Sequence, residues 1–88
     1  MANPEFPDVE IYTTPTCPDC HQLKAWLVRN GVPFIERDLT DPAVAEEAKE
    51  RTGVRVAPIT VIGMQHFYGT FSSQREKLAD LLALPQGA

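Results

Sequence analysis

Two cysteines separated by two residues, Cys17 and Cys20, are the side chains of this 88-residue chain best suited to do chemistry. One helical turn brings two thiols at this spacing within reach of a disulfide. The stretch 8–13 before them alternates like a strand, and the stretch 21–28 after them has helical spacing of apolar residues. A dithiol at a strand-to-helix turn is typical of a redox site. The sequence therefore predicts thiol–disulfide exchange.

The two thiols are expected to differ in role because they occupy different positions of one helix. Cys17 is predicted at the N-cap and Pro18 at the first helical position, where a missing N–H costs nothing. A helix N-terminus carries an effective charge of about +0.5, and the N–H groups of Asp19 and Cys20 can donate to the Cys17 sulfur. We expect Cys17 to be largely thiolate, with Asp19 opposing this and Lys24 weakly offsetting Asp19. Cys20 is expected to be more buried and protonated, and to resolve the mixed disulfide formed by Cys17.

Composition and charge limit the other classes of function. The chain is 43% hydrophobic and 23% charged, as in an ordinary globular protein, and its net charge of −4 with no basic cluster argues against a nucleic-acid binder. It has no run of about 20 apolar residues that would cross a membrane. Residues 1–7 lack the basic and apolar regions of a secretory signal, so we expect a cytoplasmic protein. Because the cytoplasm keeps thiols reduced, we do not expect a lone CxxC pair there to form a structural disulfide. Nothing in the sequence demands more than a monomer.

The remaining elements follow from periodicity and from helix start and stop residues. Asn30-Gly31 ends the first helix, with Gly31 as a left-handed cap. Asp41 caps a second helix that begins at Pro42, and its Glu47 and Arg51 are spaced for an i,i+4 ion pair. Ser72 or Ser73 is expected to cap the last helix. The other predicted elements are strands at 33–39, 59–62 and 64–68, a second helix ending near Thr52, and a last helix whose apolar face is Leu78, Leu81 and Leu82.

These elements predict an α/β fold in the order βαβ-α-ββα. A parallel pair with a right-handed crossover, followed by an antiparallel hairpin, gives a four-stranded mixed sheet with helices on both faces. We expect one domain over residues 8–84, with tails at 1–7 and 85–88.

Several motifs together resemble the glutaredoxin branch of the thioredoxin-fold proteins. They are a strand ending in Ile11-Tyr12-Thr13, the Cys17–His21 segment, Val56-Ala57-Pro58 before the third strand, and Gly69 before the last helix. The resemblance spans residues 8–82 and implies a thioredoxin fold with a cis Ala57–Pro58 bond beside the dithiol. It also implies a substrate groove in which the backbone of Ala57 meets an extended segment. The residues expected to form this groove are Thr16, Pro18, Val56, Ala57, Pro58, Gly69 and Thr70.

The resemblance also bears on the reductant. Glutathione-dependent relatives hold the tripeptide with a lysine three residues before the first cysteine, where this chain has Thr14, and with an acid after the glycine, where it has Thr70-Phe71-Ser72-Ser73. Each such charged hydrogen bond is worth about 1.5–3 kcal/mol. The departure favours a redoxin that serves ribonucleotide reductase and is recharged by thioredoxin reductase. Glutathione remains an alternative, since Arg51 or Arg55 could meet its glycine carboxylate.

Other interpretations of the same residues were weighed against this one. A haem attached at Cys17–His21 would require export of the protein, and no export signal is present. A zinc site from Cys17, Cys20, His21 and His66 would need two ligands that are neighbours in the sequence and another in the middle of a strand. An iron–sulfur cluster or metal bridged between two copies is the alternative of a different class. We expect no resident metal or bound cofactor. Trp26 is expected in the core, Tyr12 in sheet packing, His21 on the surface, and Tyr68 or Phe71 either in the core or at an apolar docking rim.

Overall fold

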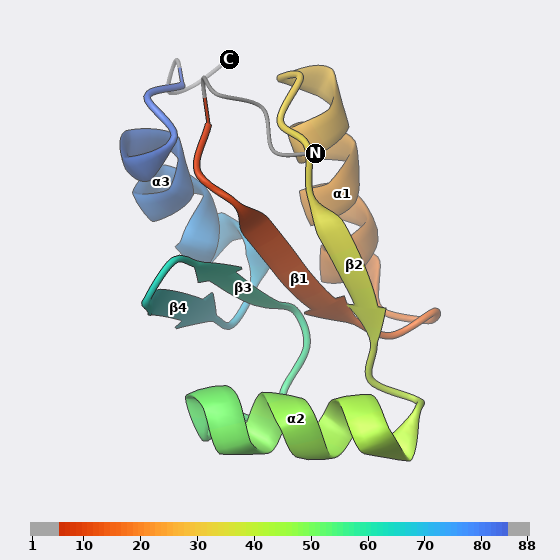
Figure 1. Cartoon of the computed structure of the whole chain (residues 1–88). Coiled ribbons are helices and arrows are strands. Elements are labelled where there is room, and N and C mark those ends of the chain that lie inside the picture. Colours follow the sequence, from red (N-terminus) through yellow and green to blue (C-terminus); the bar gives the residue numbers. More distant parts are fainter. Residues whose placement is uncertain (1–5, 85–88) are drawn as a thin grey trace.

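The computed structural model describes residues 6–84, and they form one four-stranded sheet flanked by three helices. The elements are β1 (Val9–Thr13), α1 (Pro18–Arg29), β2 (Ile35–Asp38), α2 (Pro42–Thr52), β3 (Ile59–Ile62), β4 (Gln65–Tyr68) and α3 (Phe71–Leu81) (Figure 1). The strand order is β2-β1-β3-β4; β1 and β2 run parallel, and the other pairs are antiparallel. The predicted βαβ-α-ββα order and mixed sheet are confirmed, and the fold is a thioredoxin fold. The tails expected at 1–7 and 85–88 fall mostly outside the described residues, although Phe6 packs against the core.

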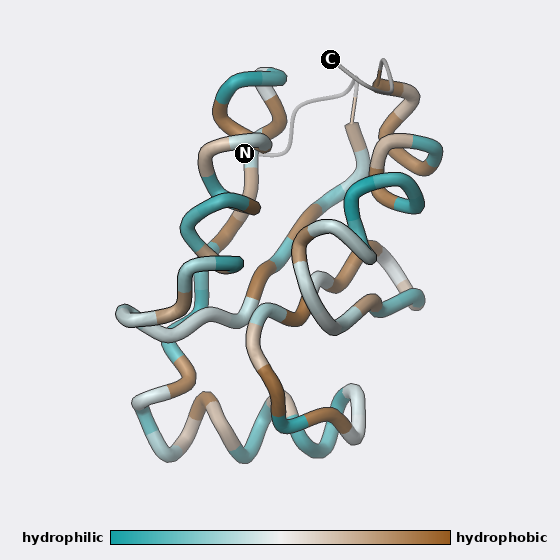
Figure 2. The backbone as a smooth tube through the Cα atoms, turned by 180° about the vertical axis from the view of Figure 1, so that it is seen from behind, coloured by the Kyte–Doolittle hydropathy of each residue, from teal (hydrophilic) through white to brown (hydrophobic). Residues whose placement is uncertain are grey.

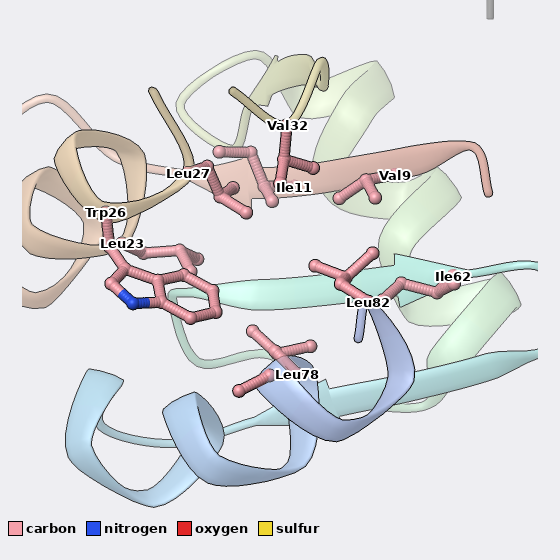
Figure 3. Close-up of a cluster of buried hydrophobic side chains, with 10 residues drawn as sticks. Val9, Ile11, Leu23, Trp26, Leu27, Val32, Ile62, Leu78 and Leu82 are labelled. Atoms are coloured by element: carbon pink, nitrogen blue, oxygen red, sulfur yellow. The ribbon is translucent and has the colours of Figure 1, made fainter. Parts of the chain in front are cut away.

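Helices α1 and α3 cover one face of the sheet and enclose the larger core. Figure 3 shows Leu23, Trp26 and Leu27 of α1 and Leu78 near the end of α3 gathered around Ile11 of β1. The cluster is completed by Val9, Val32, Ile62, Ala79 and Leu82. The core position predicted for Trp26 is confirmed. Helix α2 covers the opposite face alone, over a smaller cluster of Tyr12, Val44, Ala48, Ile59 and Val61.

Tyr12 shows why one strand can supply both cores. Alternation along β1 sends Ile11 toward α1 and α3 and sends Tyr12 toward α2, where its ring is buried. Its hydroxyl donates to Glu47 at 2.6 Å and accepts from Arg51 at 3.0 Å. Burial and the bond to Glu47 raise the pKa of Tyr12. The sheet-packing role is confirmed, and the hydroxyl adds a polar link from β1 to α2.

Two helix starts follow the predicted chemistry, and the third does not. Cys17 caps α1 and Asp41 caps α2, each followed by proline at the first helical position. Gly31 has φ +69°, as predicted for the left-handed residue after α1. The cap of α3 is Thr70, whose hydroxyl oxygen accepts from Ser73 N–H at 3.2 Å, so the prediction of Ser72 or Ser73 was wrong. The helix begins earlier because the chain already leaves β4 at Gly69, whose φ of +106° turns it directly into α3.

Three smaller predictions also need correction. The strand expected at 33–39 is limited to Ile35–Asp38, because Phe34 turns its ring to the core before strand pairing with β1 begins. The second hairpin strand begins at Gln65, after a turn through Gly63 with φ +60°. Leu81 is 38% exposed, and the apolar face of α3 is made by Leu78, Ala79 and Leu82.

A further correction concerns the ion pair predicted within α2. Arg51 binds Glu10 of β1 at 2.6 Å, and Glu47 binds Arg37 of β2 at 2.9 Å. Both α2 side chains point across to the sheet, so long-range partners replace the local one. Within residues 6–84, no helix is long and apolar enough to cross a membrane.

Candidate redox site

The register of the sheet brings three loops to one end of the molecule. Tyr12 of β1 lies opposite Ile59 of β3, and Ile59 lies opposite Tyr68 of β4. The turn after β1, the segment before β3 and the loop after β4 therefore meet at this edge (Figure 1). These segments carry Cys17, Ala57-Pro58 and Gly69-Thr70. The fold thus collects the predicted site residues although they are spread over more than fifty positions of the chain.

Cys17 occupies the N-cap of α1 in the conformation that presents its sulfur to the helix end. Its Sγ accepts from the Cys20 N–H at 3.1 Å, and its own N–H donates to the Thr14 carbonyl at 3.3 Å. Of the two backbone donors predicted for this sulfur, the structure shows that of Cys20. The side chain is partly exposed, so a substrate disulfide can reach it. The Cys17 sulfur therefore lies at the N-terminus of α1 with one backbone N–H as its donor.

Cys20 lies behind Cys17, one helical turn further into the protein. It is 0% exposed and belongs to the buried face of α1. Burial, together with the hydrogen bond of its thiol to Cys17, raises the pKa of Cys20 to about 12, against a smaller opposing effect of the Thr14 backbone. The burial predicted for the second cysteine is confirmed, and the raised pKa agrees with the protonated state predicted for it. The pair is therefore asymmetric, with one accessible sulfur and one protected thiol.

The side chain of Asp19 binds the start of the last helix. Its Oδ1 accepts from the Phe71 N–H at 3.0 Å, at the N-terminus of α3. The first N–H groups of a helix have no partner inside the helix, so this carboxylate satisfies one of them. Phe71 also meets α1 through its ring, which lies edge-on to Trp26 with centroids 5.9 Å apart. Asp19 thus joins the redox turn to α3, a contact between residues 52 positions apart.

The loop before β3 contains the cis peptide predicted at Ala57–Pro58. Pro58 is buried, Ala57 half-buried and Val56 exposed. Ala57 and Thr14 share the wall of an open hollow of about 340 Å³ between this loop and α2. The other residues around this hollow are Leu39, Ala45, Glu46, Lys49, Val54 and Arg55.

One site residue was not anticipated from the sequence. Gln74 of α3 is 1% exposed, and its amide nitrogen donates to the carbonyls of Pro58 at 2.9 Å and Gly69 at 3.0 Å. Its amide oxygen accepts from Thr60 Oγ1 at 2.7 Å. A single glutamine in a helix belongs to no functional motif. The only signal in the sequence is that Gln74 lies one helical turn before Leu78, which puts it on the buried side of the helix.

The remaining candidates lie outside the dithiol. His21 is exposed, as predicted, with its Nε2 2.9 Å from the Pro15 carbonyl oxygen, and His66 lies on β4 stacked against Tyr68. No three His, Cys, Asp or Glu side chains within residues 6–84 converge into a metal site. Tyr68 is 58% exposed at the edge of the site, and Phe71 is half-buried against Trp26. Tyr68 is therefore the exposed aromatic at this edge.

Comparison with known proteins gives a consistent answer. The family model described as Glutaredoxin matches residues 9–67. The chain belongs to the glutaredoxin family. This glutaredoxin is 43% identical over 63 residues to "Glutaredoxin 3" of Escherichia coli K12, an alignment covering 70% of the chain and 76% of the relative.

Solved structures extend the match in three dimensions. A solution structure of glutaredoxin from Brucella melitensis is 37% identical, with a TM-score of 0.67, covering 91% of this chain and 94% of that one. The crystal structure of the thioredoxin-like protein BC3987 gives a TM-score of 0.75 at 32% identity and covers 83% and 97%. Together with the asymmetric dithiol, these relatives identify the chain as a thiol–disulfide oxidoreductase with a Cys17/Cys20 pair that acts on protein disulfides.

Proposed function

We propose that this glutaredoxin reduces disulfides of cytoplasmic proteins, with ribonucleotide reductase as the expected kind of substrate, and is recharged by thioredoxin reductase. The observation that carries the choice of reductant is the absence of charge at two positions of the site. Thr14 precedes Cys17, and the start of α3 after Gly69 is Thr70-Phe71-Ser72-Ser73. Of the two arginines that could replace these charges, Arg51 is already paired with Glu10 and donates to Tyr12.

The cycle uses the asymmetry of the two thiols. Cys17 thiolate attacks one sulfur of the substrate disulfide, forming a mixed disulfide and releasing the other sulfur as a thiolate that takes up a proton. Cys20 then loses its proton and attacks the Cys17 sulfur, releasing the second substrate thiol. The substrate has gained two electrons, and the enzyme holds a Cys17–Cys20 disulfide. Thioredoxin reductase returns two electrons from NADPH. This cycle requires a compartment that keeps thiols reduced, hence the cytoplasm.

The substrate segment is proposed to lie across the three loops that meet beside Cys17. Thr16, Pro18 and Val56 are exposed, which supports their place along one side of the groove, and Gly69 and Thr70 are proposed to form the opposite wall. Ala57 is only half-buried, which supports backbone pairing with an extended segment, and the buried Pro58 is proposed to form the wall opposite Gly69. These seven residues remain proposed contacts.

Glutathione is the second candidate, and Arg55 favours it. Arg55 makes no ion pair with any described residue and lines the hollow next to Thr14 and Ala57, where it could meet a carboxylate. One cation in place of several would give weak binding, because each charged hydrogen bond lost costs about 1.5–3 kcal/mol.

The test compares two recharging systems on one disulfide substrate. One contains glutathione, glutathione reductase and NADPH, and the other contains thioredoxin reductase and NADPH. We expect turnover only with thioredoxin reductase. Thr14→Lys should raise glutathione-coupled turnover by about tenfold, since one charged bond is worth roughly that factor, whereas Thr14→Gln should not. Efficient wild-type turnover with glutathione would overturn the proposal, and its loss in Arg55→Gln would assign the glutathione contact to Arg55.

A further inference from the structure

Gln74 is the buried polar side chain that connects the two walls of the proposed groove. It lies in the first turn and a half of α3, four residues after the N-cap Thr70. Both hydrogens of its amide nitrogen are used, one by the Pro58 carbonyl and one by the Gly69 carbonyl, and its oxygen accepts from Thr60. The amide orientation is fixed, because carbonyls can only accept and the nitrogen must face them.

The two carbonyls belong to segments that lie just outside the strands. Pro58 precedes β3 and Gly69 follows β4, just beyond the last register pair, Ile59 and Tyr68. Gly69 has φ +106°, and a Cβ there would lie 3.0 Å from Ser73 Oγ. The chain at Gly69 therefore has a conformation that glycine permits, and Gln74 anchors its carbonyl.

We propose that Gln74 is a positioning residue for substrate binding, because it fixes the spacing between the Pro58 and Gly69 walls beside Cys17. This inference rests on the proposed substrate groove. A carboxamide is required here, since it offers two donors and one acceptor in a neutral group. A glutamate has only acceptors to offer two carbonyls, and a methionine offers no donor. Gln74 does not contact Cys17, so it acts on substrate fit and leaves the nucleophile unchanged.

The test is a single-turnover assay in which enzyme reduced with dithiothreitol, then freed of it, reduces insulin disulfides. This assay needs no reductase, so it is independent of the reductant question. Gln74→Met, which keeps the size of the side chain and removes both donors, should raise the half-saturating insulin concentration about tenfold while the rate at saturation changes less than about threefold. Alkylation of Cys17 by iodoacetamide, which needs no groove, should stay within about twofold of wild type.

Two matched controls separate positioning from general stability. Thr60→Val removes only the third hydrogen bond of Gln74 and leaves both carbonyl contacts in place. Leu78→Ala opens a cavity on the same helix, away from the groove carbonyls. Both variants should have a lower melting temperature and an unchanged half-saturating insulin concentration. If either raises half-saturation as much as Gln74→Met does, or if a folded Gln74→Met binds insulin normally, the inference is wrong.

A measurement on the wild-type protein applies even if Gln74→Met does not fold. Both side-chain amide protons of Gln74 should exchange slowly with solvent in NMR spectra and show scalar couplings across hydrogen bonds to the Pro58 and Gly69 carbonyls. Rapid exchange of either proton overturns the inference. Failure of the wild-type enzyme to reduce insulin at all would instead count against the proposed function.

Discussion

The two faces of the sheet are stabilised by different forces. The face covered by α1 and α3 encloses a ten-residue apolar cluster (Figure 3), and its polar contacts include the buried neutral ones of Gln74 and one ion pair, Lys24–Glu36. The face covered by α2 has a five-residue cluster and depends on ion pairs to the sheet, Arg37–Glu47 and Arg51–Glu10. In Figure 2 the tube of α2 alternates between hydrophilic and hydrophobic colours, whereas the central strands carry much of the hydrophobic colour.

The difference matters because the redox chemistry belongs to one face only. Cys20 is buried in α1, Asp19 joins α1 to α3, and Gln74 joins α3 to the groove. Close packing holds such a site in one geometry at any ionic strength. Partly exposed ion pairs are worth only about 0–1 kcal/mol each and weaken in salt. The α2 face, with two such pairs, should therefore respond more strongly to salt and pH than the α1–α3 face, which has the single pair Lys24–Glu36.

The largest expected effect is on activity and concerns the α1–α3 face. Cys17→Ser should lower disulfide reduction by at least about a thousandfold, because a hydroxyl replaces the thiolate nucleophile. Cys20→Ser should accumulate a Cys17 mixed disulfide with the substrate, visible by mass spectrometry. Tyr12→Phe, on the other face, should keep the rate within about twofold. A comparable loss in Tyr12→Phe would show that the chemistry is not confined to one face.

The next effect compares the two cores by their stability. Leu78→Ala should lower the free energy of unfolding by about 2–5 kcal/mol, because it leaves a cavity in the larger cluster. Val44→Ala removes less apolar surface from the smaller cluster and should cost about 1–2 kcal/mol. Urea unfolding at neutral pH measures both. Equal losses would mean that the two cores are equally well packed.

A smaller effect tests the polar network on the α2 face. Tyr12→Phe removes the hydroxyl that links Glu47 and Arg51, and should cost about 0.5–1.5 kcal/mol. The urea midpoint of the wild type should fall as sodium chloride is raised toward 1 M, and that of an Arg37→Gln, Arg51→Gln double variant should fall less. Thr60→Val, with its lost bond on the other face, should retain the salt response of the wild type.

The smallest effect is the dependence of stability on acid. The bond from Tyr12 lowers the pKa of Glu47, and bonds from Thr13 and Lys24 lower the pKa of Glu36. A carboxyl group whose pKa is lower in the folded state stabilises the protein above its ordinary pKa, and that stabilisation disappears as pH falls through the lowered value. Urea midpoints should therefore decline below about pH 5. Glu47→Gln should make the fall of the urea midpoint with pH shallower. An unchanged fall would show that Glu47 does not contribute to the acid dependence.

Local patterns predicted most of the scaffold and the chemistry. The boundaries of α1 and α2 could be predicted from the sequence. The signals were the spacing of Cys17 and Cys20, a proline after each N-cap and a glycine after each helix. Three hydroxyl residues near the start of α3 left its cap ambiguous, and the backbone turn at Gly69 selects Thr70.

What escaped prediction depends on residues distant in sequence. Asp19 could be recognised as a charge beside the dithiol, but its partner Phe71 is 52 positions away. Glu47 and Arg51 fit a local pair, yet the sheet offers each a partner across the core. Gln74 is a polar residue whose contacts exist only after β3, β4 and α3 have met. Each contact requires tertiary structure, which periodicity does not encode.

The burial of Cys20 has a further consequence under oxidative stress. Peroxide meets Cys17 first, because Cys17 is the exposed sulfur, and converts it to a sulfenic acid. Cys20 lies one helical turn from that sulfur, and its N–H already donates to it, so we expect its thiol to condense with the sulfenic acid, releasing water and forming the Cys17–Cys20 disulfide. Further oxidation to the irreversible sulfinic acid is thereby pre-empted. The buried thiol thus acts as an internal repair group that returns the damaged cysteine to the catalytic cycle.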